Sequence, residues 1–266
     1  MSAEESLRLA RSDYVRGLLA WRIWLRLGLG DIRIRYKRTV LGPLWITLSM
    51  TATFVAMGML FSAVYRNDVH RFLPYLAAGM VTWSAMSAVA QEGPQIFVNA
   101  HHVISSLRVP LVVHVLRCVV RNAMIYFYNS AAALASYLLL GGEPRAAHFL
   151  LLLYLPVFFA TLSAAGLILA IIGARYRDLG PIIGVGTQLL FFMTPIMWNL
   201  DDLPNARKWW VMINPLYHLI EIVRAPMLGA APPLLSVAVS LGCLLLLGLA
   251  GYGLFSLFRR RIPYWL

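Results

Sequence analysis

The chain has 266 residues, of which 60% are hydrophobic and 13% charged, and its formal net charge at pH 7 is +12. This length allows one helical bundle and excludes a bundle with a separate catalytic domain. In so hydrophobic a chain, we interpret the positive charge as a membrane-orienting feature and expect no nucleic-acid partner. The two cysteines lie in apolar surroundings and can form neither a disulfide framework nor a metal site.

Six stretches without Asp, Glu, Lys or Arg decide the fold class. They contain 27, 20, 21, 29, 22 and 34 residues, and a helix needs about 20 apolar residues to cross a membrane. Lipid offers no hydrogen-bond partner to an open backbone, so we expect helices. The predicted fold is an all-α integral membrane protein with six transmembrane helices, over residues 41–64, 73–91, 119–140, 148–173, 181–200 and 233–257.

Residues 1–38 form a predicted cytoplasmic amphipathic region, with a helix lying in the membrane surface from Asp13 to Gly30. Arg22 and Arg26 fall on one edge of this helix, and an apolar stripe that includes Trp21 lies nearby. Two glycines, Gly28 and Gly30, weaken the expectation that the helix continues as far as the basic cluster before the first span.

The first span carries a candidate substrate-channel face. Met50, Phe54, Met57 and Phe61 recur at helical spacing, and the fifth span adds Phe191, Phe192 and Trp198. Aromatic faces suit sugars, because the C–H surface of a sugar stacks on a ring. The alternative is helix packing or lipid contact, and spacing alone does not separate the two.

Residues 92–110 are predicted to form a cytoplasmic coupling segment. Glu92-Gly93-Pro94 ends the second span, and apolar residues recur at helical spacing after it, which predicts a short helix. His101 and His102 are adjacent, so their rings do not share one helical face. We therefore favour a partner or surface contact over metal binding for this pair.

The cytoplasmic loop after the fourth span contains Arg175, Arg177 and Asp178. We interpret these residues as membrane-orienting anchors, with a contact to a partner as the alternative. Of the 23 Lys and Arg, 17 fall on the side that holds both termini when there are six spans and the N-terminus is inside. Both termini are therefore predicted to be cytoplasmic.

Residues 203–230 form a predicted external re-entrant region. Trp209 to Ile220 is apolar but only 12 residues long, and Asn214-Pro215 interrupts it. A run of this length is typical of a re-entrant or interfacial segment, so we expect two short helices. Glu221 and Arg224 are three residues apart and can pair. The alternative is an ordinary external loop with a surface ion pair.

The chain contains no phosphate-binding loop of the Gly-x-x-x-x-Gly-Lys-Ser/Thr type. The centres of the six spans also lack Asp, Glu, Lys and Arg, so an ion gradient has no obvious residue through which to act. If the protein moves a substrate, we expect the energy to enter from another chain. This chain is predicted to be a channel-forming subunit and not an enzyme.

The order of several motifs resembles the membrane subunit of an ABC-2 type exporter of the polysaccharide kind. The motifs cover nearly the whole chain: Arg35-Tyr36-Lys37-Arg38-Thr39-Val40-Leu41-Gly42-Pro43-Leu44-Trp45, Ala174-Arg175-Tyr176-Arg177-Asp178, Thr194-Pro195-Ile196, Asn214-Pro215-Leu216-Tyr217, Glu221-Ile222-Val223-Arg224-Ala225-Pro226 and Phe258-Arg259-Arg260-Arg261.

The resemblance implies a homodimer in the bacterial inner membrane, paired with two copies of a separate ATPase subunit that binds ATP and Mg. It implies an ATPase contact through the N-terminal helix and the coupling segment, with the candidates Arg22, Arg26, Asn99, His101, His102 and Arg108. It implies an external gate at Asn214, Pro215, Glu221 and Arg224, and contact of Phe54, Phe61 and Trp198 with the glycan. The implied substrates are lipid-linked O-antigen, capsule or teichoic-acid-type chains.

Three alternatives stay open at this point. The first is an ABC-2 exporter of another lipid or of a drug-like cargo. The second is an ion-coupled secondary transporter, which would move its cargo without an ATPase. The third is a membrane-bound glycosyl- or lipid-processing enzyme, but the scattered acidic residues offer it no convincing catalytic pair.

Overall fold

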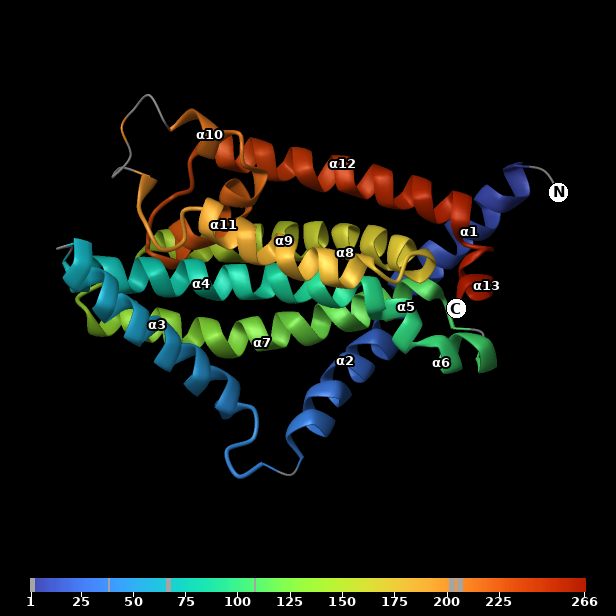
Figure 1. Ribbon diagram of the computed structural model, residues 1–266, viewed down its shortest axis with the longest axis horizontal. Coiled ribbons are helices and arrows are strands. Elements are labelled where there is room, and N and C mark those ends of the chain that lie inside the picture. Colours follow the sequence, from blue (N-terminus) through green and yellow to red (C-terminus); the bar gives the residue numbers. More distant parts are fainter. Residues whose placement is uncertain (1–2, 38, 66–67, 108, 201–203, 205–207) are drawn as a thin grey trace.

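The computed structural model describes residues 3–37, 39–65, 68–107, 109–200, 204 and 208–266. All regular elements within these residues are helices, as predicted (Figure 1). They are α1 (Ala3–Leu19), α2 (Trp21–Tyr36), α3 (Leu44–Tyr65), α4 (Val69–Glu92), η1 (Gly93–Gln95), α5 (Ile96–Asn99), α6 (His101–Ser106), α7 (Leu111–Leu139), η2 (Ala146–Leu150), α8 (Leu151–Arg175), α9 (Leu179–Met193), α10 (Trp209–Met212), α11 (Pro215–Met227), α12 (Leu234–Phe258) and α13 (Ile262–Trp265).

The long helices α4, α7, α8 and α12 form a bundle that runs along the longest axis of the molecule (Figure 1). The segment that begins with α4 is the most enclosed, since 78% of its most apolar window is buried. The corresponding values are only 11% for α3 and 17% for α12. Helices α3 and α12 are therefore peripheral, with apolar surface available to lipid or to another chain.

In the part of the chain that the structure describes, five segments are long and apolar enough to cross a membrane: Leu44–Val64, Val69–Ser106, Leu111–Leu139, Ala146–Arg175 and Leu234–Phe258. The predicted fifth span, residues 181–200, is only partly helical, because α9 ends at Met193. Proline disfavours the helical conformation in the residue before it, which here is Thr194. At 1.5 Å per residue, α9 measures about 22 Å, shorter than the hydrocarbon core of about 30 Å. The count of six crossings stays a prediction.

The helix that contains the predicted third span, residues 119–140, is longer than that span. Helix α7 begins at Leu111, directly after Pro110. Arg117 and Arg121 lie inside the helix, where acidic side chains from other helices pair with them. Between α4 and α7, the predicted coupling segment contains the three short helices η1, α5 and α6.

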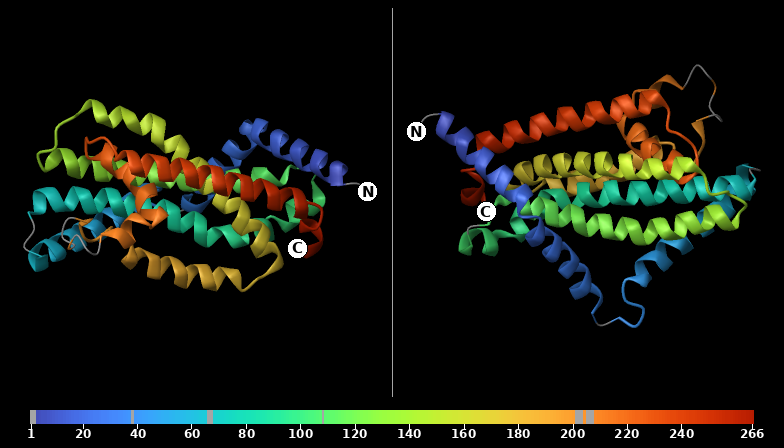
Figure 2. Two further views of the ribbon diagram at one scale, coloured as in Figure 1. Left: turned by 90° about the horizontal axis from the view of Figure 1, so that it is seen from above. Right: turned by 180° about the vertical axis from the view of Figure 1, so that it is seen from behind.

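The N-terminal region contains two helices instead of the single one expected from Asp13 to Gly30. The break falls at Ala20, and α2 continues through both glycines as far as Tyr36. Gly28 serves close packing here, because a Cβ at this position would approach Val120 Cγ1 of α7 to 2.9 Å. The glycines therefore do not end the helix. Helices α2 and α3 slope away from the bundle and meet where they connect (Figures 1 and 2).

The predicted external region forms two short helices, α10 and α11, as expected. Helix α11 packs against α4, α8 and α12, and ten of its side chains are buried. Both chain termini lie at the opposite end of the bundle, near α6 and α13 (Figure 1).

Two apolar clusters hold the chain together. The larger one surrounds α4 and includes Phe54 from α3 and Phe158 from α8. The smaller one, at the end with the termini, includes Phe97 from α5, Phe255 from α12 and Ile262 from α13. Helices α1, α5 and α13 are thus packed onto the bundle by apolar contacts.

Candidate functional site

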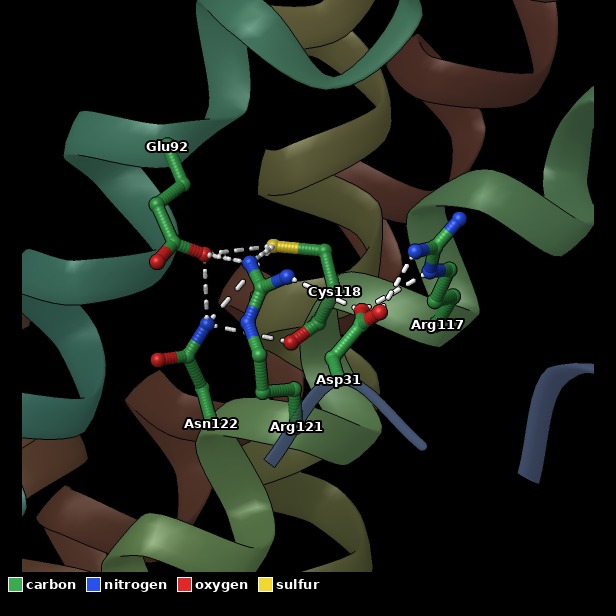
Figure 3. Close-up of polar contacts among 6 residues, drawn as sticks. All are labelled: Asp31, Glu92, Arg117, Cys118, Arg121 and Asn122. Atoms are coloured by element: carbon green, nitrogen blue, oxygen red, sulfur yellow. Dashed lines mark hydrogen bonds and ion pairs between the residues drawn. The ribbon is translucent and has the colours of Figure 1, made fainter. Parts of the chain in front are cut away.

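A network of charged side chains joins three helices near the end with the termini (Figure 3). Arg117 of α7 binds Asp31 of α2 through two bonds, Nε to Oδ2 at 2.8 Å and Nη2 to Oδ1 at 2.5 Å. Arg121, one turn further along α7, binds Asp31 through Nη1 at 3.1 Å and Glu92 of α4 through Nη2. The pairs tie the surface helix α2 and the end of α4 to the same face of α7.

Glu92 receives further hydrogen bonds on Oε2. Asn122 Nδ2 donates to this atom at 2.9 Å and the Cys118 thiol at 3.1 Å. Charge-assisted hydrogen bonds are roughly twice as strong as neutral ones, so this arrangement holds the last turn of α4 firmly. Glu92 is the first residue of the coupling segment, so this segment is joined at its start to α7 directly and to α2 through Arg121.

The charges of this network are partly removed from water, and their pairing with one another offsets the energetic cost of that removal. The side chains of Asp31 and Arg121 are 13% and 19% exposed. Burial alone would raise the pKa of Asp31, but its hydrogen bonds and charge interactions with Arg117 and Arg121 outweigh burial and hold that pKa below its usual value.

Sequence reasoning missed this network. It counted Arg117 and Arg121 among the membrane-orienting charges and treated Glu92 only as the end of a span. One signal was available: the two arginines are four residues apart, and this spacing places both on one helical face. The sequence could not identify their partners, because Asp31 is 86 and 90 residues away from them.

The network lies at the boundary of two cavities. One, of about 530 Å³, lies between α3, α4 and α7, and the other, of about 380 Å³, is lined by residues of α4, α5 and α7. Glu92 and Arg35 line both cavities. Asn99, a predicted ATPase contact, lines the smaller cavity.

A second polar junction, centred on Asp13 of α1, joins α1 to α7 and α12. Its Oδ1 accepts a hydrogen bond from the backbone N–H of Leu111 at 3.2 Å, and its Oδ2 binds Arg259 Nε at 2.5 Å. The side chain is only 3% exposed. Burial raises the pKa of Asp13, although Arg259 and the bond from Leu111 oppose this shift. Asp13 satisfies an otherwise unpaired N–H at the start of α7.

A cavity of about 890 Å³ lies beside this junction. Helix α1 contributes Asp13 and Arg16 to its lining, α6 contributes Ile104 and Ser105, and the C-terminal region contributes Tyr264. The cavity therefore lies where α1, the coupling segment and the C-terminal region meet.

The predicted ATPase-contact residues fall into separate groups. His101 and His102 lie on α6 with their ring centroids 5.4 Å apart, and His102 is exposed. Arg22 and Arg26 are exposed on α2 and line neither the 890 Å³ nor the 380 Å³ cavity. Arg108 lies outside the described residues.

The cytoplasmic-loop candidates follow the end of α8. Arg175, Arg177 and Asp178 are all exposed. The guanidinium of Arg175 lies 5.3 Å from the ring centroid of Trp265, so this residue links α8 to α13.

At the opposite end of the bundle, the predicted gate residues are tightly connected. Asn214 accepts a hydrogen bond from Leu216 N at 3.0 Å, which caps α11 beside Pro215, and its Nδ2 donates to Thr194 Oγ1 at 3.1 Å. The predicted pair forms, with Arg224 Nη2 at 2.5 Å from Glu221 Oε2. It is not a surface pair, because Arg224 is only 2% exposed.

Arg224 also connects α11 to the segment that follows α9 and to α4. Its Nη1 donates to the carbonyl oxygen of Pro195 at 2.7 Å. Its guanidinium carbon lies 4.0 Å from the ring centroid of Tyr75 in α4, a cation–π distance. Arg224 thus fixes α11 to two other segments of the chain.

The residues of the predicted channel face have different environments. Phe54 is 1% exposed, and Met50, Met57 and Phe61 pack against the same core cluster. In this conformation Phe54 therefore packs in the core, which is the alternative to a channel-lining role. Contact of its ring with a substrate would require α3 to move. Phe191 lies 5.9 Å from the ring centroid of Trp83, and Trp198 stacks on Trp210 at 6.5 Å. Phe192 is 62% exposed.

Comparison with known proteins gives consistent matches over most of the chain. The profile of the family described as ABC-2 type transporter matches residues 25–228. The chain is 28% identical over 243 residues to the O-antigen export system permease protein RfbA of Myxococcus xanthus, covering 87% of this chain and 90% of that protein. It is 22% identical over 192 residues to RfbA of Klebsiella pneumoniae, covering 71% and 74%. It is 23% identical over 255 residues to the polysialic acid transport protein KpsM of Escherichia coli, covering 92% and 96%.

Proposed function

Because the chain belongs to the ABC-2 type transporter family, we propose that it is the membrane permease subunit of an ATP-driven exporter of a lipid-linked polysaccharide. One observation carries this proposal: two relatives named for O-antigen export and polysialic acid transport match 87% and 92% of this chain. The cargo that we favour is O-antigen, since the relatives from M. xanthus and K. pneumoniae are both named for its export.

The energy is proposed to come from a separate ATPase subunit, of which two copies bind a homodimer of this chain. ATP and Mg would bind that subunit, since this chain has no phosphate-binding loop. The 890 Å³ cavity between α1, α6 and the C-terminal region supports a contact surface at this end of the bundle. Because ATP is cytoplasmic, both termini would then lie on the cytoplasmic side of the bacterial inner membrane.

The homodimer proposal is supported by exposed apolar side chains that recur on α9. Ile182, Val185, Leu189 and Phe192 are between 60% and 63% exposed and lie three or four residues apart. Helix α3 also exposes most of its apolar surface. Faces of this kind fit a second copy that encloses a channel with the first, with α10 and α11 as the external gate.

Reconstitution of purified components tests the proposed function. The chain alone, in liposomes with lipid-linked glycan on the ATPase-facing side, should export no glycan when ATP is added. The chain reconstituted with the ATPase encoded beside it should export glycan, and the export should stop when the ATPase cannot hydrolyse ATP. Uphill transport by the chain alone in an ion gradient would contradict the proposal.

A further inference from the structure

We call the 530 Å³ cavity between α3, α4 and α7 the membrane groove. Its lining contains several polar side chains, which are uncommon in membrane spans. Helix α3 contributes Ser49 and Thr53, α4 contributes Ser84, and α7 contributes Asn129. All three helices belong to candidate membrane spans. Polar side chains within a span face the bundle interior or a water-filled cavity and mark a substrate path more often than they face lipid.

The hydroxyl groups of the membrane groove have already used their hydrogens. Ser49 Oγ donates to Trp45 O at 2.9 Å, Thr53 Oγ1 to Ser49 O at 2.8 Å, and Ser84 Oγ to Val81 O at 2.7 Å. A hydroxyl group has one hydrogen to donate and two lone pairs that can accept. These three oxygens can therefore still accept hydrogen bonds, but they cannot donate further ones in this geometry.

Asn129 adds a fourth acceptor. The residue is 1% exposed, and among the described residues its side-chain oxygen has no hydrogen-bond partner. A buried polar atom without a partner costs about 1 to 3 kcal/mol, so a ligand or water that donates a hydrogen bond here would be stabilised. At these four atoms the membrane groove accepts hydrogen bonds, so this part of it requires a ligand that donates, and Arg35 is a charged donor elsewhere in the same lining.

This requirement selects one class of ligand. Phosphate and carboxylate groups are acceptors when ionised, so an anionic group of a ligand matches the guanidinium of Arg35 in this lining and not these four oxygens. A sugar ring carries several O–H donors and also has an apolar C–H face. The rings of Trp45 and Tyr36 lie in the same lining and can pack against that face. The volume falls within the usual range for small-ligand sites, about 300 to 1,000 Å³.

We propose that the membrane groove is a sugar-binding subsite, formed within a single copy of the chain, for the lipid-proximal sugar of the exported glycolipid. This inference rests on the proposed function, which makes the cargo a glycolipid. The alkyl chain of the cargo would lie in the bilayer beside the start of α3, where Leu44 and Leu48 are 62% and 51% exposed. The divergence of α2 and α3 from the bundle leaves this part of α3 accessible from the side (Figure 1).

A pair of photoreactive detergents tests the subsite on the full-length chain in phosphatidylcholine nanodiscs. One is dodecyl maltoside with a diazirine on its alkyl chain, and the other is a polyoxyethylene ether with the same alkyl chain and diazirine. The ether headgroup has many acceptors but almost no donors. Mapping of the labelled peptides by mass spectrometry should show that the maltoside labels α3 and α7 around the groove at least about fivefold more than the ether does.

Substitutions then identify the acceptors. Thr53→Val keeps the shape of the side chain and removes its oxygen, and Asn129→Leu removes the unpaired oxygen. Each should reduce labelling by the maltoside about fivefold. Thr161→Val is the matched control, because Thr161 makes the same type of bond, to Val157 O at 2.8 Å, but does not line the groove. If Asn129→Leu fails to fold, Thr53→Val alone still decides the result.

Three outcomes would overturn the subsite: equal labelling by both detergents, labelling unaffected by Thr53→Val and Asn129→Leu, or displacement of the maltoside by an equal concentration of phosphatidylglycerol. The last would assign the groove to a bilayer lipid. ATP-dependent export by the reconstituted complex separates this failure from failure of the proposed function. Export without groove labelling would reject only the subsite, whereas labelling without export would reject the function.

Discussion

At the scale of single residues, a buried charge decides how helix α11 is held. Arg224 is almost completely buried, and its neighbours are a carboxylate, a carbonyl oxygen and an aromatic ring. A buried charge of this kind is tolerated only while its partners remain, because removal of one partner leaves an uncompensated charge in a medium of low dielectric constant. Asp31 has a similar position between two arginines at the other end of the bundle.

Removal of the partner of Arg224 should destabilise the protein. We expect Glu221→Gln to lower the free energy of unfolding by about 3 kcal/mol and to lower the apparent melting temperature in detergent. Glu143→Gln, in an exposed turn at the same end, is the control and should change the free energy by less than about 0.5 kcal/mol. The double substitution Glu221→Gln with Arg224→Met should recover most of the loss. An equal effect of Glu221→Gln and Glu143→Gln would show that the buried pair contributes nothing.

The low pKa of Asp31 predicts how the network depends on pH. A carboxylate with a lowered pKa in the folded state stabilises the fold above its unfolded pKa, and the stabilisation disappears as the pH falls through the folded pKa. We expect the wild type to exceed Asp31→Asn by about 1 to 2 kcal/mol above the unfolded pKa of about 4, and the difference to disappear as the pH falls through the lower folded pKa. Thermal unfolding of both proteins across this range measures it. A difference that grows in acid would contradict the assignment.

At the scale of elements, the helices outside the central bundle are attached at a few defined points. Helix α1 is held by Asp13, which contacts the start of α7 and the end of α12. Helix α2 is held by Asp31 and by the close contact of Gly28 with α7. Helix α3 is held mainly through the side chains that it turns toward the core cluster. Each attachment can be tested by a single substitution.

Removal of the Asp13 carboxylate should release α1 from the bundle. Asp13→Ala leaves Leu111 N without its acceptor and Arg259 without its partner, so we expect a loss of about 1 to 2 kcal/mol. Hydrogen exchange should rise in residues 3–19 more than in α4. Asp178→Ala is the control, because Asp178 is exposed and makes no capping hydrogen bond to the helix that it precedes. Unchanged exchange in α1 would rule out the junction as its attachment.

Substitution of Phe54 and of Phe192 distinguishes a role in packing from a role in substrate contact. Phe54→Ala removes a buried ring from the core and should cost about 3 to 5 kcal/mol. Phe192→Ala changes an exposed side chain and should change stability by less than about 0.5 kcal/mol. Thermal unfolding compares the two, and glycan export by the reconstituted complex should be measured at a temperature where both remain folded. A stability loss below about 1 kcal/mol for Phe54→Ala would contradict its role in the core.

At the scale of the whole molecule, the positions of the termini constrain the topology. The start of α1 and the C-terminus lie at the same end of the bundle (Figure 1), which fits the predicted even number of crossings. The five long apolar segments alone would place the termini on opposite sides. Helix α9 is apolar and, together with the turn that follows it, is the candidate for the sixth crossing.

Reporter fusions test this topology directly. Green fluorescent protein fused to either terminus should fluoresce, because it folds in the cytoplasm but not after export through the general secretion pathway. Alkaline phosphatase inserted in the turn at residues 141–144 should be active, because it needs the oxidising space outside the membrane. Fluorescence from only one terminal fusion would mean an odd number of crossings and would remove α9 from the set of spans.

The sequence alone predicted the helical class, the approximate positions of the long apolar helices, and short helices within residues 92–110 and 203–230. These features depend on local hydrophobicity and on proline, charge and length, which a single segment carries within itself. The pairing of Glu221 with Arg224 was also predictable, since the two residues lie one turn apart on the same helix.

Only the tertiary structure decided which distant residues meet. The sequence does not show that Asp31 lies between Arg117 and Arg121, or that Phe54 turns toward the core. It also does not show that Asp13 contacts both the start of α7 and the end of α12. The same spacing of apolar side chains is produced by a packing face, a lipid face and a channel face. The choice between them depends on which other helix lies opposite, and that is a property of the assembled bundle.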